Sequence, residues 1–174
     1  VPFRVKSGMR SGKAKINKQE ARAVVAIIRA CLEQPEYEKK TFGVLSLLGE
    51  EQADFIRNEL LKEIEPADID KHEIICGNAA GFQGDERDVM ILSMVDSNES
   101  ETPLRLMGAG PDDAYKKRYN VAVSRAKDQL WLVYSLDPAR DLKEGDLRRR
   151  LIEYMLNPHA LDKRIEEARG KAES

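Results

Sequence analysis

The chain has 174 residues, of which 41% are hydrophobic and 34% are charged, a composition typical of one soluble globular domain. Its formal net charge is −2, so no global positive field indicates nucleic-acid binding, although residues 1–30 hold eight basic side chains against the single acid Glu20. No apolar run is long enough to span a bilayer, the first residues lack the apolar segment of a signal peptide, and Cys31 and Cys76 have no paired spacing. We therefore predict a cytoplasmic protein with reduced thiols and no metal site, and Val1 in place of Met suggests a domain excised from a longer protein. The basic start is either a nucleic-acid-facing patch or an ordinary solvated surface.

The basic start contains the sequence GMRSGKA at Gly8–Ala14, which invites comparison with a phosphate-binding loop. The Walker pattern needs four residues between its glycines and a Ser or Thr after the Lys. Here three residues separate the glycines, and Ala14 follows Lys13. We therefore predict that this segment is not a P-loop.

Helical and strand-like patterns alternate along the next part of the chain. Asn17 followed by Glu20 is typical of a helix N-terminus. The elements expected here are a helix that closes at Pro35, a buried strand at 41–48, a helix at 50–64 with Phe55, Ile56, Leu60, Leu61 and Ile64 on its buried side, and a short strand at 73–76.

The second half continues the alternation. The elements expected in it are a glycine-rich turn at 77–88, a buried strand at 89–95, a polar loop at 96–113, a helix at 114–126, a buried strand at 130–135, and helices at 145–156 and 158–169. Helices that alternate with apolar strands predict a parallel sheet covered on both faces.

The turn carries residues suited to binding a nucleotide. In open α/β sheets the ligand lies beyond the carboxyl ends of the strands, and this turn starts at such an end. Gly84 lets backbone approach a ligand closely, Gln83 can orient a water or a phosphate oxygen, and Glu86 can receive ribose hydroxyls. The alternative is that residues 86–88 form only a surface ion-pair cluster.

Two arginines follow on the next expected helix. Arg118 and Arg125 are seven residues apart, so they would project from one helix face with the small Ala122 between them. Paired guanidinium groups beside a glycine-rich turn suit a phosphate chain. The alternative is a helix whose arginines face solvent.

Together these segments resemble a known family. AAGFQGDERDVMILS and KRYNVAVSRAKDQLWLV resemble motifs V and VI of superfamily 1 DNA/RNA helicases, most closely the branch of the nonsense-mediated-decay helicase, and residues 42–60 resemble motif IV. The resemblance covers residues 16 to 135. It implies the RecA-like three-layer α/β sandwich of the P-loop NTPase superfamily, here without a P-loop of its own. It also implies a basic lead-in at 1–15, a second RecA-like domain at 16–145 and a C-terminal helical extension at 146–174.

The resemblance further implies roles at an ATP site. Arg125 matches the arginine finger that contacts the γ-phosphate, and Gln83 and Gly84 match residues beside that phosphate. Glu86 matches the acid that holds the ribose, and Arg118 matches a basic position that supports the phosphate or the domain contact. Arg125 and Gln83 are the expected catalytic residues.

Other matched positions concern the nucleic-acid strand and the local structure. Gln52 matches the glutamine of motif IV, and Asn78 lies where the family usually has Thr or Ser near the strand path. Ala80, also near the strand path, stands where relatives often have Asp. Asp88 and Ser124, with Asn120, match positions that brace the turn and the helix.

A complete motor also needs a Walker lysine and an acidic pair for magnesium, and this chain has neither. We therefore expect ATP with Mg²⁺ to bind between this domain and a preceding RecA-like domain, a single strand of DNA or RNA as the other partner, no membrane, and no ATP turnover by the domain alone. A non-catalytic nucleic-acid-binding or adaptor module is the main alternative. A metal-dependent nuclease is disfavoured, because Asp96, Glu99 and Glu101 lack a neighbouring lysine.

Overall fold

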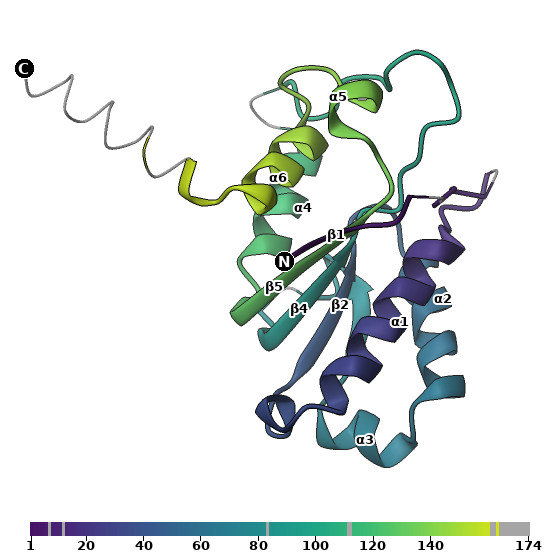
Figure 1. The fold of residues 1–174 in the computed structure, drawn as a ribbon, viewed down its shortest axis with the longest axis vertical. Helices are drawn as coiled ribbons and strands as arrows, with labels where there is room; N and C mark the ends of the chain where they lie inside the picture. Colours follow the sequence, from purple (N-terminus) through teal and green to yellow (C-terminus); the bar gives the residue numbers. More distant parts are fainter. Residues whose placement is uncertain (7, 12, 83, 111–112, 161–162, 164–174) are drawn as a thin grey trace, which may run out of the picture.

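A five-stranded parallel sheet forms the middle layer of the molecule (Figure 1). The computed structural model describes residues 1–6, 8–11, 13–82, 84–110, 113–160 and 163. The strand order is β1-β5-β4-β2-β3, and every pair is parallel. The strands are β1 (Pro2–Arg4), β2 (Phe42–Ser46), β3 (Ile75–Asn78), β4 (Arg87–Ser93) and β5 (Ala126–Tyr134). The predicted parallel α/β sheet is thereby confirmed.

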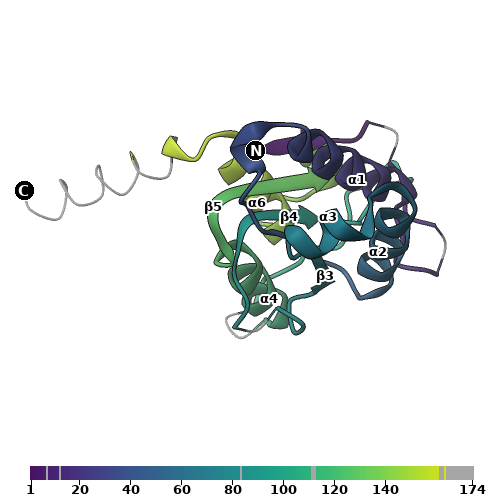
Figure 2. The same cartoon turned by 90° about the horizontal axis from the view of Figure 1, so that it is seen from below.

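Helices cover both faces of this sheet, as Figures 1 and 2 show. One face carries α1 (Lys18–Leu32) and α2 (Glu51–Glu63), and the other carries α4 (Ala114–Val123) and α6 (Leu147–Leu156). Three short helices occur in the connections: η1 (Pro35–Tyr37), α3 (Pro66–Lys71) and α5 (Pro138–Asp141). None of the helices in the described part of the chain is long and apolar enough to cross a membrane.

The strands supply alternate residues to two separate cores, because neighbouring side chains of a strand point to opposite faces. In β2, Val44 faces the helices α1 and α2, while Leu45 faces α4 and α6. In β4, Ile91 faces α1 and α2, while Met90 faces α4 and α6. Both faces of these central strands are buried, which explains why they read as continuous apolar runs.

The predicted helix starts and buried faces are mostly confirmed. Asn17 caps α1, and its side-chain oxygen accepts a hydrogen bond from the Glu20 N–H at 3.1 Å. In α2 the fully buried Ile56 lies on the face toward the sheet. Leu61 was expected on that face, but it is 58% exposed, so this part of the prediction is wrong. One residue beyond the buried Leu60, it has rotated by about 100° out of the apolar stripe.

Both ends of the chain contribute more to the domain than the sequence indicated. Pro2–Arg4, placed in the lead-in, form the edge strand β1 beside β5. Leu151 and Ile152 of α6, placed in the C-terminal extension, are buried in the same core as α4. Three residues are too few for a strand to show a sequence pattern. Of the helix expected at 158–169, residues 161, 162 and 164–169 lie outside the described part of the chain.

Candidate functional site

The glycine-rich turn runs along one face of the sheet, from the carboxyl ends of the strands to their amino ends. It leaves β3 at Asn78, at the carboxyl ends of the strands, and enters β4 at Arg87, at the amino ends. Between them Phe82 is 1% exposed and packs on the sheet over Gly43 of β2. A Cβ on Gly43 would lie 2.4 Å from the Met90 sulfur and 2.9 Å from the Phe82 ring, so the packing of both side chains over this strand requires glycine here.

The second half of the turn exposes its polar residues. Gly84 has φ +88°, a left-handed conformation that glycine adopts without the steric cost of a Cβ, and an added Cβ there would meet nothing within 4 Å. Asp85 and Glu86 after it are exposed. Gln83 lies outside the described residues, so its predicted catalytic role stays a prediction.

Arg125 lies at the same edge of the sheet as Glu86. Its carbonyl oxygen accepts a hydrogen bond from the Arg87 N–H at 3.0 Å, and Arg87 pairs with Ala126 where β4 and β5 begin. The structure therefore brings the residue expected to be the arginine finger next to the end of the glycine-rich turn.

The Arg125 side chain carries an unused hydrogen-bond donor. Within the described residues, its Nε is buried and has no hydrogen-bond partner. Leaving a buried donor unpaired costs about 1–3 kcal/mol, so such groups in folded proteins usually have an external partner or a functional reason. Arg125 as a whole residue is half-buried.

Arg118 does not share a helix face with Arg125, contrary to the spacing argument. Helix α4 ends at Val123, so Arg125 lies outside it. Ala122, expected to leave room for both guanidinium groups, is fully buried against the sheet. Arg118 is exposed, and its Cζ lies 5.3 Å from the centroid of the Tyr115 ring in a cation–π contact.

The end of the strands at which Glu86 and Arg125 lie also differs from the expectation. The turn was expected to bind its ligand beyond the carboxyl ends of the strands, but Glu86 and Arg125 lie at the amino ends of β4 and β5. Two features cause this placement. The turn crosses the whole face of the sheet before β4 starts, and α4 runs back across the same face before β5 starts.

Asp88 ties the amino end of β4 to Thr41, the residue before β2. Its Oδ2 accepts hydrogen bonds from the Thr41 N–H at 2.8 Å and the Thr41 hydroxyl at 3.0 Å, and the Asp88 N–H donates back to that hydroxyl. The Thr41 backbone N–H is the main cause that lowers the pKa of this carboxyl. In the alternative reading residues 86–88 form a surface ion-pair cluster; the structure shows Arg87 approaching Asp85 at 4.0 Å.

Of the two residues expected near the nucleic-acid strand, Asn78 is half-buried and Gln52 is fully buried. The Asn78 side-chain oxygen accepts a hydrogen bond from the Gly81 N–H at 3.0 Å. Gln52 accepts one from the Asn17 N–H at 2.8 Å and donates one to the Ser93 hydroxyl at 3.1 Å. The oxygen and the nitrogen of its side chain are thus both hydrogen-bonded inside the protein. We therefore do not place Gln52 among the residues that contact the nucleic-acid strand.

A buried polar network around Glu20 was not foreseen. Glu20 is fully buried, and its carboxylate accepts hydrogen bonds from the hydroxyls of Ser93 and Ser135 and from the N–H of Val95. Burial raises its pKa to about 7, although these hydrogen bonds act in the opposite direction. The Asn17–Glu20 spacing was visible in the sequence, but it indicated only a helix cap.

This network holds a strained residue at the end of β4. Val95 has φ +70°, a left-handed conformation that is unfavourable for a β-branched side chain. Its N–H donates to Glu20 at 2.8 Å, and its carbonyl accepts from the Asn17 side chain at 3.1 Å. Both backbone polar groups at the strained position are therefore satisfied by buried side chains.

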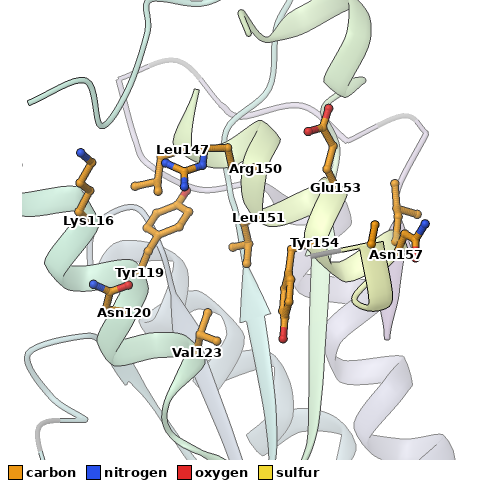
Figure 3. Close-up of a pocket in the computed structure, with 12 residues that line it drawn as sticks. Lys116, Tyr119, Asn120, Val123, Leu147, Arg150, Leu151, Glu153, Tyr154 and Asn157 are labelled. Atoms are coloured by element: carbon orange, nitrogen blue, oxygen red, sulfur yellow. The ribbon is translucent and has the colours of Figure 1, made fainter. Parts of the chain in front are cut away.

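A groove of about 840 Å³ lies between α4 and α6, away from the Arg125 edge. Figure 3 shows side chains of α4 facing those of α6 across it, among them Tyr119, Val123, Leu151 and Tyr154. Neither Glu86 nor Arg125 lines this groove. In the described part of the chain, no group of three or more His, Cys, Asp or Glu side chains is arranged to hold a metal ion.

Comparison with known proteins gives two matches. A model of the family described as AAA domain matches residues 3–137 of the chain. This is a family of P-loop proteins, and together with the parallel sheet the match confirms the RecA-like α/β fold. A Mycoplasma genitalium protein named as an uncharacterized ATP-dependent helicase is 31% identical over 163 residues, an alignment that covers 84% of this chain. The chain spans only 14% of that relative's length.

Proposed function

The chain belongs to the AAA domain family, and from this premise we propose that it is the C-terminal motor domain of an ATP-dependent superfamily 1 helicase. The observation that carries the proposal is the buried Nε of Arg125, which has no partner among the described residues and lies at the end of the sheet where Glu86 and Gly84 are exposed. A donor held without an acceptor next to a glycine-rich turn is what an arginine finger needs before its phosphate arrives. The helicase name of the Mycoplasma relative supports the same class of activity.

In this proposal the nucleotide lies between two domains. A preceding RecA-like domain supplies the Walker lysine and the acidic residues that hold Mg²⁺, neither of which this chain contains. Arg125 neutralises charge that develops on the γ-phosphate, and the backbone at Gly84 approaches the phosphates without steric hindrance. Glu86 receives the ribose hydroxyls, and the exposed Arg118 supports the phosphates or the contact between domains.

In this proposal the turn between β3 and β4 links the nucleotide to the nucleic-acid strand. Its first residue, Asn78, lies at the carboxyl ends of the strands, and Glu86 near its other end lies at the amino ends. Phe82 fixes the middle of the turn to the sheet, so a shift at one end is transmitted through a packed ring. We infer that closure of the two domains on ATP moves the strand-facing end of this turn.

The test joins this chain to its preceding RecA-like domain and measures ATP hydrolysis stimulated by a single strand. Arg125→Ala should lower kcat by about 10³-fold or more, the usual effect of an arginine finger, with little change in KM for ATP. Arg29→Ala is the matched control, because Arg29 is exposed on α1, far from the proposed site, and forms a surface ion pair with Glu63 at 2.8 Å. If the two variants hydrolyse ATP equally fast, Arg125 is not the finger and the proposal fails.

A further inference from the structure

A short basic hairpin lies at the carboxyl ends of the strands. Arg10 and Asn17 form an antiparallel bridge, and the described residues between them form its arms and tip. We call this segment the basic hairpin. Arg10, Lys13 and Lys15 are all exposed, so the cations of the hairpin face solvent.

The base of the hairpin is rigidly built into the fold. Asn17 is fully buried, and its side-chain nitrogen donates hydrogen bonds to the Val95 carbonyl at 3.1 Å and the Ser135 hydroxyl at 2.9 Å. Its backbone N–H donates to Gln52 at 2.8 Å. Just before the hairpin, Gly8 packs so closely that a Cβ would lie 1.9 Å from the Ser135 hydroxyl oxygen. Binding of a ligand to the hairpin therefore costs little conformational entropy at the hairpin base.

Among the described residues, no acidic side chain forms an ion pair with the two lysines of the hairpin. Glu20, the single acid among residues 1–30, is fully buried beneath the hairpin base and does not face solvent. Neither Lys13 nor Lys15 makes an ion pair with any described residue. Both lysines are exposed, and the stem of Lys15 lies over Gly49, close to the carboxylate of Glu51.

Arg10 is only loosely held. Its guanidinium is 3.3 Å from one oxygen of Asp96, and its side chain is 38% exposed. The other oxygen of Asp96 is bonded at 2.8 Å to Arg148, whose side chain is 5% exposed. Because the buried Arg148 already neutralises Asp96, Arg10 can turn to an incoming anion without leaving an unpaired buried charge.

The hairpin lies at the opposite end of the sheet from the nucleotide edge. Asn17 contacts Val95 after β4 and Ser135 after β5, whereas Arg125 precedes β5. A ligand on the hairpin and a nucleotide at Arg125 can therefore be bound at the same time.

We propose that the basic hairpin binds the phosphate backbone of a single nucleic-acid strand through Arg10, Lys13 and Lys15. The identification of the polyanion as a nucleic-acid strand rests on the proposed helicase function. The hairpin offers cations at its tip and no aromatic side chain for stacking, so the binding is electrostatic and independent of base sequence.

The experiment measures binding of this chain to a fluorescent oligothymidine of about 12 nucleotides by anisotropy over a series of KCl concentrations. The test variant is Lys13→Gln/Lys15→Gln. Removing one lysine–phosphate pair should reduce the slope of log K against log salt by about 0.7, so the slope of the double variant should be smaller by about 1.4, and its affinity at low salt should fall about tenfold or more. The matched control, Lys39→Gln/Lys71→Gln, removes the same charge from exposed lysines that precede β2 and β3 at the amino ends.

Equal decreases in affinity for the test and control variants would show a response to net charge alone and would overturn the proposal. Absence of binding by the unmodified chain at low salt would also overturn it. The outcome is separate from that of the motor proposal. If the lysine variants bind oligothymidine normally while Arg125→Ala still abolishes hydrolysis in the joined domains, the hairpin inference fails and the motor function stands.

Discussion

The buried carboxyl of Glu20 makes the stability of the domain depend on pH near neutrality. Its two oxygens accept hydrogen bonds from the hydroxyls of Ser93 and Ser135, the N–H of Val95 and the side-chain nitrogen of Asn17. All four partners are neutral. Removal from water disfavours the ionised form more than these bonds favour it, and the pKa rises from 4.5 to about 7.

The magnitude follows from the difference in pKa between the unfolded and folded states. A rise from 4.5 to about 7 corresponds to about 3 kcal/mol at 1.36 kcal/mol per unit. Between these values the folded state binds a proton that the unfolded state has released. The free energy of unfolding therefore falls as pH rises from 4.5 to about 7, and this contribution is constant above that range.

The substitution Glu20→Gln removes the titration and leaves a side chain of the same shape. Two of the four partners, the Val95 N–H and the Asn17 side-chain nitrogen, can only donate, so the N–H₂ group of the new amide lacks an acceptor from them and costs stability by an amount that does not vary with pH. Urea unfolding of both proteins between about pH 4.5 and pH 8 gives the difference in unfolding free energy at each pH. As pH rises across this interval, we expect the unfolding free energy of the variant to increase by about 3 kcal/mol relative to that of the original chain.

The control is Glu33→Gln, which makes the same chemical change at an exposed side chain just after α1. A flat difference for Glu20→Gln would show that the carboxyl does not titrate near neutrality in the folded state. A change of the opposite sign would show that the hydrogen bonds outweigh the removal from water. Either result refutes the reasoning.

Two further substitutions test single features of the fold. Arg148→Met removes the cation that bonds to Asp96 and to Asp146, both at 2.8 Å, and should lower the unfolding free energy by about 3–5 kcal/mol in urea, because the buried Asp146 carboxylate loses this cation and Asp96 keeps the loosely held Arg10 at 3.3 Å; a decrease below about 1 kcal/mol would contradict this account. Gly84→Ala should cost about 1–2 kcal/mol through left-handed backbone strain alone, since the added Cβ meets nothing. Gly110→Ala, equally unhindered but without a positive φ, should cost no more than a few tenths, and equal costs at the two glycines would rule out strain as the cause.

The sequence by itself determined the features that depend on local chemistry. Helix α1 begins at Asn17 because a side-chain oxygen there can cap the helix, and apolar runs at helical or strand spacing marked the central elements. The same local reasoning excluded a P-loop at Gly8–Ala14. It also selected Gly84, Glu86 and Arg125 as candidate site residues, and the structure places Arg125 next to the end of the turn that carries the other two.

The tertiary structure alone decided which edge of the sheet carries the site and which polar side chains are internal. The pairing of Arg87 with Ala126 brings Arg125 to the amino ends of the strands, and that register depends on residues about forty positions apart. The burial of Gln52 and Glu20 depends on how α1 and α2 dock on the sheet. A sequence pattern reports the spacing of neighbours along the chain, whereas the direction in which a turn crosses a sheet and the dehydration of a carboxyl are set by contacts between distant segments.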